Sequence, residues 1–186
     1  MAKCKRLLEM EELEKEVKNV IRDVHDFPKE GIVFKDITTL LSKPDLNQKV
    51  QEAFIKEAYK LHADVIVGID SRGFLYGNTI ASKLGIPFVP VRKKGKLPYK
   101  TIQSSYQLEY GEAVLEIHTD AISNGQKVLI HDDLLATGGT AYATAELVER
   151  LGGEIVGFSF IIDLSFLNGA DKLLEKSDNL FAIATY

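Results

Sequence analysis

Apolar residues recur at three- and four-residue spacing over residues 5–24, with Glu and Lys at most positions between them. This pattern is typical of an amphipathic helix with one buried face. The segment HDFPKEG ends the helix, because Pro28 disfavours helical backbone at the residue before it. A second helix is expected after the break at residues 43–45, with Asp45 as its candidate cap, running to about residue 61.

Farther along the chain, short apolar runs alternate with helical stretches. The runs expected to be strands are 64–69, 87–91, 127–131 and 154–162, and the helical stretches between them end near Gly85 and span 140–151. Such alternation is typical of βαβ units. We therefore expect an α/β fold with a mainly parallel, twisted sheet flanked by helices. Ligands of such sheets bind beyond the carboxyl ends of the strands, which directs attention to residues 70–77 and 132–140.

Composition narrows the class of protein. The chain has 186 residues, of which 45% are apolar and 27% charged, so one domain over residues 1–186 is expected. A net charge of −4 counts against a general nucleic-acid binder. The lone Cys4, the lack of a long apolar run and the lack of a signal-peptide pattern favour a cytoplasmic protein without membrane contact.

The most informative segment is VLIHDDLLATGGT, residues 128–140. Its small residues at the start of a helix let backbone amides converge on an anion, and the helix dipole adds positive potential. The hydroxyls of Thr137 and Thr140 can donate to the same anion. The expected phosphate cradle consists of Ala136, Thr137, Gly138, Gly139 and Thr140.

Two adjacent carboxylates, Asp132 and Asp133, precede this cradle. They cannot bind a phosphate, because like charges repel. They can accept hydrogen bonds from vicinal sugar hydroxyls or hold a hydrated Mg²⁺. A phosphate cradle beside a ribose or metal site suits a ribose 5-phosphate.

The same segment resembles the phosphoribosyl-diphosphate (PRPP) motif of type I phosphoribosyltransferases. Three further segments resemble the adenine phosphoribosyltransferase family, in its order and spacing: DFPKEGIVFKDIT, GIDSRGFLYG and VRKKGKLPYKTIQSSYQLEYG. Together the four cover most of residues 26–169. The resemblance implies a Rossmann-like domain with a purine-facing hood in residues 1–34 and a flexible catalytic loop in residues 92–111.

The leaving pyrophosphate needs cations and backbone donors. Arg72 follows an expected strand in a glycine-bounded loop, where its planar guanidinium can bind phosphate oxygens, and the resemblance makes it a catalytic group as well. The resemblance assigns pyrophosphate binding to Ser71, Arg72, Arg92, Lys93 and Lys96. In related enzymes the basic residues of this kind reach the pyrophosphate of a neighbouring subunit, so a homodimer is expected.

The family's catalytic glutamate matches Glu109 in YQLEYG. The purine N9 must lose its proton as it attacks the ribose, and a carboxylate near the purine can accept or relay that proton. Tyr106 and Tyr110 are expected to pack the flexible loop when it closes over the substrates and excludes water.

Adenine recognition is implied for Val33, Phe34, Lys35 and Leu164. Phe34 would stack on the purine, the backbone of Val33 and Lys35 would read its edge, and Leu164 would cover the opposite face. Lys35 stands where arginine is frequent in the family. Enzymes for 6-oxopurines carry an aspartate at the position of Ala136, so this chain fits the adenine branch.

The resemblance thus implies a Mg²⁺-dependent enzyme of purine salvage that converts adenine and PRPP to AMP and pyrophosphate. Two alternatives stay open on the sequence: transfer to orotate or xanthine, which Ala136 alone does not exclude, and a regulator that keeps the PRPP site as a sensor and binds nucleic acid. The second needs a basic face or a DNA-binding segment.

Overall fold

The computed structural model describes residues 2–107 and 112–186, with side chains from residue 7 and outside 107–112. A seven-stranded sheet in the order β5-β6-β4-β3-β7-β8-β9 forms its centre. The strands are β3 (Val65–Ile69), β4 (Phe88–Lys93), β5 (Thr101–Gln107), β6 (Glu112–His118), β7 (Lys127–Leu135), β8 (Glu154–Asp163) and β9 (Leu180–Thr185). The strands from β4 through β9 in this order pair in parallel, and β6 and β5 are antiparallel additions at one edge. The expected mainly parallel sheet is confirmed.

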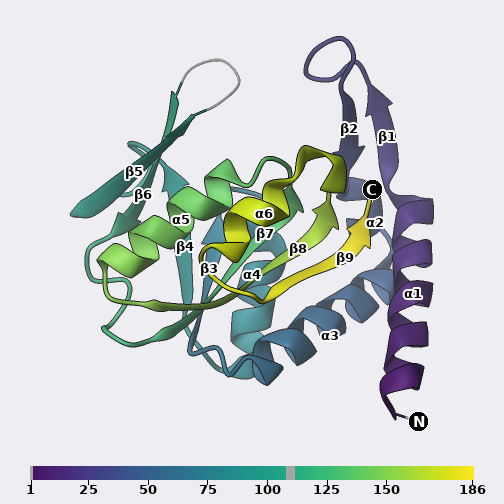
Figure 1. Cartoon of the computed structure of the whole chain (residues 1–186), viewed down its shortest axis with the longest axis horizontal. Coiled ribbons are helices and arrows are strands. Elements are labelled where there is room, and N and C mark those ends of the chain that lie inside the picture. Colours follow the sequence, from purple (N-terminus) through teal and green to yellow (C-terminus); the bar gives the residue numbers. More distant parts are fainter. Residues whose placement is uncertain (1, 108–111) are drawn as a thin grey trace.

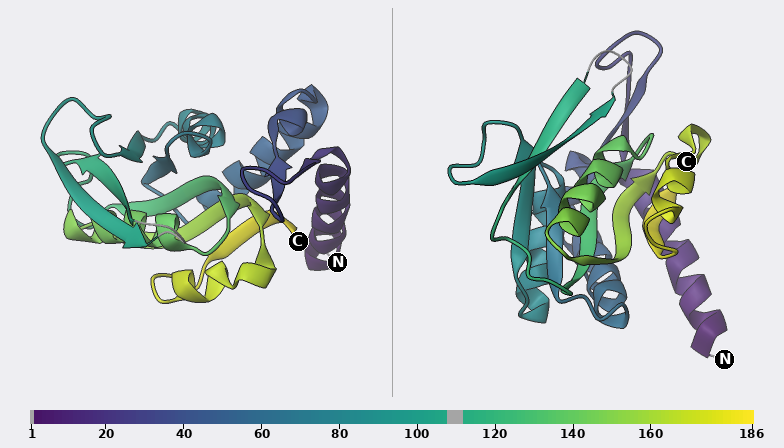
Figure 2. Two further views of the ribbon diagram at one scale, coloured as in Figure 1. Left: turned by 90° about the horizontal axis from the view of Figure 1, so that it is seen from above. Right: turned by 60° about the vertical axis from the view of Figure 1, so that its left-hand side comes forward.

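Helices cover both faces of the sheet (Figures 1 and 2). Their bounds are α1 (Ala2–Val20), α2 (Thr38–Leu41), α3 (Pro44–Lys60), α4 (Gly73–Leu84), α5 (Gly139–Arg150) and α6 (Gly169–Leu174), with a short 3₁₀ turn at Ser165–Leu167. One apolar core lies under α1, α3 and α4 around Phe54, and the other lies under α5 and α6 around Phe158. Burial on both faces explains why β3 is apolar at every position.

Two antiparallel hairpins project at the end of the sheet where the parallel strands finish (Figure 1). One is β1 (Arg22–His25) with β2 (Val33–Asp36), and the other is β5 with β6. No helix in the described part of the chain is long and apolar enough to cross a membrane.

Two predicted boundaries at the N-terminal side are wrong. The first helix ends at Val20, and Val24 lies in β1 opposite Phe34, because pairing with β2 satisfies the backbone there better than another helical turn would. Asp45 does not cap the second helix: Lys43 is the N-cap residue, and Pro44 opens the helix because its fixed φ suits that position. Asp45 lies in the first turn, where its charge favours the helix dipole.

Part of the segment 92–111, which is expected to be a flexible loop, lies in strands. Arg92 belongs to β4, and residues 101–107 form β5, in which Ile102, Ser104 and Tyr106 face inward. The ladder with β6 satisfies their backbone, and Ser104 donates to Glu146 of α5 at 2.7 Å. Long-range pairing with β6, together with this inward packing, makes the segment a strand.

Candidate active site

The expected phosphate cradle lies between the end of β7 and the start of α5. Gly138 is the N-cap residue, with φ +76°, and no side chain caps the helix. The first amides of α5 are therefore available to an anion. A hollow of about 70 Å³ is lined here by Asp132, Leu134, Leu135, Ala136, Thr137, Gly138, Gly139, Thr140, Ala141 and Phe160. The structure thus brings all five expected cradle residues to one hollow.

Gly169 was missed by the sequence reasoning. A Cβ on Gly138 would lie 2.6 Å from the Gly169 carbonyl oxygen, and a Cβ on Gly169 would overlap the Ala136 carbonyl oxygen. The start of α6 therefore presses directly on the cradle. The only sequence signal was the dipeptide Asn168-Gly169, which reads as an ordinary turn.

The acidic pair lies within β7 rather than in the loop after it, so the two side chains point to opposite faces of the sheet. Asp132 is half-buried and lines the hollow. Asp133 is 3% exposed, and its Oδ2 lies 2.6 Å from the Arg72 Nε. Arg72 reaches it because Gly73, whose Cβ would lie 2.6 Å from the His131 carbonyl oxygen, lets α4 start against β7.

The two carboxyl groups share an unfavourable environment for charge. Burial and the neighbouring Asp133 raise the pKa of Asp132 well above its usual range. Burial also raises the pKa of Asp133, although the Arg72 guanidinium opposes that shift. Folded protein therefore binds protons here more strongly than unfolded chain does, and the pair's contribution to stability is lost as pH rises above the ordinary carboxyl range.

We expect Asp132→Asn to stabilise the protein at pH 8 by about 1–2 kcal/mol, or about 2–8 °C in Tm, while slowing PRPP turnover. Asparagine removes the charge but keeps the oxygen that accepts the Asp133 amide at 2.9 Å. Thermal unfolding at pH 5 and pH 8 measures the effect, which should shrink at the lower pH. The exposed Asp120→Asn serves as control, and an equal Tm change in both variants would contradict the prediction.

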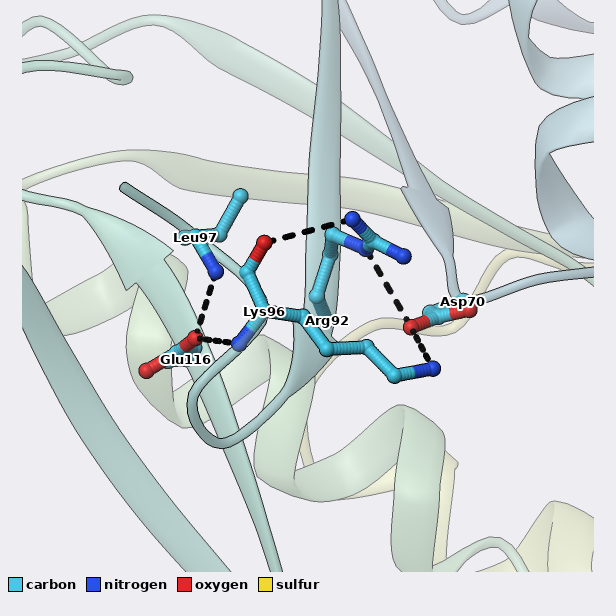
Figure 3. Close-up of polar contacts among 5 residues, drawn as sticks. All are labelled: Asp70, Arg92, Lys96, Leu97 and Glu116. Atoms are coloured by element: carbon cyan, nitrogen blue, oxygen red, sulfur yellow. Dashed lines mark hydrogen bonds and ion pairs between the residues drawn. The ribbon is translucent and has the colours of Figure 1, made fainter. Parts of the chain in front are cut away.

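A second charged cluster lies at the end of β3. The side chain of Asp70 is 4% exposed, and its Oδ2 lies 3.2 Å from the Arg92 Nε and 3.0 Å from the Lys96 Nζ (Figure 3). Burial alone would raise the pKa of Asp70, but Lys96 and Arg92 outweigh it and hold the pKa below its usual value. Asp70 is a further residue that the sequence reasoning did not assign, although it begins the DSRG motif.

The strand expected to bind adenine, β2, lies beside Arg72, the arginine that pairs with Asp133. The Arg72 guanidinium carbon is 5.1 Å from the centroid of the Phe34 ring, which also packs edge-to-face on Phe27 at 5.2 Å. Lys35 turns away, with its Nζ 2.7 Å from an Asp23 carboxylate oxygen and 4.0 Å from the Tyr186 ring centroid.

The remaining predicted residues are dispersed around these clusters. Val33, Ser71 and Lys93 are exposed. Leu164 donates its amide to the Leu135 carbonyl at 2.9 Å, next to the cradle.

Two residues of the expected flexible loop, Glu109 and Tyr110, lie outside the described residues. Tyr106 is half-buried and packs on the core under α5. In the described part of the chain, no group of three or more His, Cys, Asp or Glu side chains could hold a metal ion.

Comparison with known proteins decides the family. The family model for the phosphoribosyl transferase domain matches residues 36–180. An adenine phosphoribosyltransferase of Ruminiclostridium cellulolyticum is 55% identical over 172 residues, which are 92% of this chain and 99% of the relative. This chain belongs to the adenine phosphoribosyltransferase family. Another member of the family, from Cytophaga hutchinsonii, is 48% identical over 94% of this chain and 96% of its own length.

Solved structures of the adenine phosphoribosyltransferase family share the fold. The enzyme of Thermoanaerobacter pseudethanolicus superposes with a TM-score of 0.88 at 46% identity, over 92% of this chain and 99% of that one. The enzyme of Saccharomyces cerevisiae, solved with adenine and an imino-altritol bisphosphate, gives a TM-score of 0.86 at 40% identity, over 92% and 98% of the two chains. The family resemblance and the fold expected from the sequence are confirmed.

Proposed function

We propose that this chain transfers the 5-phosphoribosyl group of PRPP to adenine and so forms AMP and pyrophosphate in purine salvage. The observation that supports this most strongly is the hollow that joins the cradle to Asp132, in a chain whose relatives of about 50% identity are adenine phosphoribosyltransferases. We place the reaction in the cytoplasm.

Residues 136–140 bind the 5-phosphate in this proposal. The uncapped amides of α5 and the threonine hydroxyls supply the donors, and the helix dipole favours the negative charge. Asp132, which faces the same hollow, accepts from the ribose hydroxyls. Asp133 acts on the opposite face, where it orients Arg72 toward the pyrophosphate side and the Phe34 ring.

The pyrophosphate group is bound by Ser71, Arg72, Arg92, Lys93 and Lys96. Asp70 pairs with both Arg92 and Lys96, so an incoming pyrophosphate must compete with this one carboxylate for the two cations. Lys93 is exposed and remains available to the site of a neighbouring subunit. We therefore propose a homodimer in which this basic region contributes to both sites.

The base is proposed to bind between Phe34 and Leu164, with the backbone of Val33 and Lys35 reading its edge. The Lys35 side chain is engaged by Asp23, which supports a role for its backbone alone. Ala136 provides no carboxylate to pair with a 6-oxopurine ring. A site built to pair with the 6-amino group discriminates strongly against an oxo group, because buried polar atoms are then left without partners.

Magnesium is the proposed cofactor, bound mainly through PRPP oxygens and water. The residues present fit such an ion: Asp132 faces the hollow, while Asp133 is held by Arg72. When bound, Mg²⁺ would neutralise charge on the leaving pyrophosphate. Glu109 is proposed to accept or relay the purine proton, and Tyr106 and Tyr110 are proposed to pack the flexible segment when it closes over the substrates.

The deciding experiment measures nucleotide formation from PRPP with adenine, hypoxanthine, guanine, xanthine and orotate in parallel. We expect kcat/KM for adenine to exceed each of the others by at least about 10⁴-fold, the range reached when a mispaired base leaves polar groups buried without partners. Turnover of a 6-oxopurine or orotate at an equal rate would overturn the base assignment. A gel-shift titration at low salt tests the regulator alternative, for which DNA binding is required.

A further inference from the structure

Glu116 lies on β6 directly opposite Arg92 of β4, and it is only 3% exposed. Opposite charges facing each other across two strands ordinarily form a pair. Here the Arg92 Nε turns instead to Asp70. The Glu116 Oε1 accepts hydrogen bonds from the backbone amides of Lys96 and Leu97, each at 2.9 Å (Figure 3). Its carboxylate therefore binds the main chain of the turn that follows β4.

The Glu116 carboxylate also links the turn to the next strand. The Glu116 Oε2 accepts from the Thr101 hydroxyl at 3.4 Å, which ties the turn to the start of β5. Gly95 has φ +84°, so the chain reverses with its amides directed at one centre. Burial alone would raise the pKa of Glu116, but the amides of Leu97, Gly95 and Lys96 outweigh it and lower the pKa. The amides of the turn thus stabilise the charged form of the Glu116 carboxylate.

The same turn also sets the position of two cations, Arg92 and Lys96. Its Lys96 carbonyl accepts from the Arg92 guanidinium at 3.2 Å, and its Lys96 side chain reaches Asp70 at 3.0 Å. Figure 3 shows Arg92 and Lys96 converging on the same Asp70 oxygen, with Glu116 on the far side of the turn. Removing the Glu116 carboxylate would take away the acceptor that both amides share, and the turn would relax.

We propose that Glu116 is a positioning residue for the pyrophosphate end of PRPP: it holds the turn that presents Lys96 and orients Arg92, without touching the substrate itself. The inference rests on the proposed pyrophosphate role of these two cations. Cations held in place before binding lose less conformational freedom when the polyanion arrives. The effect of Glu116 should accordingly appear at the pyrophosphate end and not at the base.

The test is steady-state kinetics of Glu116→Ala in the full chain. We expect the KM for PRPP and the inhibition constant of pyrophosphate to rise about 10- to 100-fold, with the KM for adenine changed by less than about 2-fold. Glu116→Gln keeps an oxygen that can accept from both amides and should recover part of the loss. Glu57→Ala, which removes another buried glutamate from α3, is the control for burial and should show no such split.

Equal rises in both KM values, or an unchanged KM for PRPP in folded Glu116→Ala, would overturn the positioning role. Should Glu116→Ala fail to fold, Glu116→Asp decides, because its shorter side chain withdraws the carboxylate from the two amides: an unchanged pyrophosphate inhibition constant in this variant rejects the role. Lys96→Ala and Arg92→Ala separate the pyrophosphate assignment of the two cations from the positioning role of Glu116. An unchanged KM for PRPP in both Lys96→Ala and Arg92→Ala removes the pyrophosphate assignment of these two cations and the positioning role together, whereas a raised KM there beside an unchanged one in Glu116→Ala removes only the positioning role.

Discussion

Replacing Glu109 by alanine is expected to lower kcat by about 10²- to 10⁴-fold, with a smaller rise in either KM. The reason is that the carboxylate acts on a proton whose transfer accompanies attack of the purine nitrogen on the ribose, so its loss is felt in the transition state more than in the bound substrates. Single-turnover formation of AMP from saturating adenine and PRPP measures this most directly, because product release then does not contribute.

Glu109→Gln is the matched variant, since it preserves size and hydrogen bonding but cannot accept the proton. We expect it to be nearly as slow as Glu109→Ala. Glu154→Gln, at an exposed position at the start of β8, should leave kcat unchanged. A wild-type kcat in Glu109→Ala would remove the assigned role.

Replacing Gly138 by alanine is expected to raise the KM for PRPP about 10²-fold. The position has φ +76°, and the new Cβ would meet the Gly169 carbonyl oxygen at 2.6 Å, a backbone atom that cannot turn aside. Either the cradle or the start of α6 must move, and the amides that converge on the phosphate lose their common centre. Overpacking of this kind lowers the free energy of unfolding by about 1–3 kcal/mol.

Gly125→Ala provides the control for backbone strain alone. Its φ of +78° is nearly the same, but nothing lies within 4 Å of the added Cβ. This variant should lose about 1–2 kcal/mol of stability from the left-handed conformation and keep its KM for PRPP. Titration of PRPP by isothermal calorimetry, together with thermal unfolding of both variants, separates the two effects. Equal PRPP affinity in the two variants would show that contact with Gly169 does not shape the cradle.

Much of the proposed phosphate site follows from the sequence alone. A strand, two acids, a run of small residues and a helix follow one another within VLIHDDLLATGGT, so local order alone places amides, hydroxyls and carboxylates together. The alternation of apolar runs and helical stretches likewise sufficed for the parallel sheet, because each strand must be apolar on both faces. These features depend on neighbours in the sequence, and their periodicity is visible there.

Other features depend on contacts between distant segments, which periodicity cannot show. β5 is a strand because it pairs with β6, and Val24 leaves its helix because β2 lies alongside. The acids at 132 and 133 look equivalent in the sequence. Because they lie on opposite faces of β7, one lines the hollow and the other binds Arg72.

The sequence by itself determined the fold class and the family and predicted the place of the phosphate cradle, since each depends on the local order of residues. Only the tertiary structure decided the partners of the charged groups. Asp70 pairs with Arg92 and Lys96, and Glu116 binds the turn that follows β4. A charge finds its lowest free energy among all groups brought near it by folding, and Glu116 lies 20 and 19 residues along the chain from the Lys96 and Leu97 amides that it binds. Such pairings require the assembled sheet before they exist.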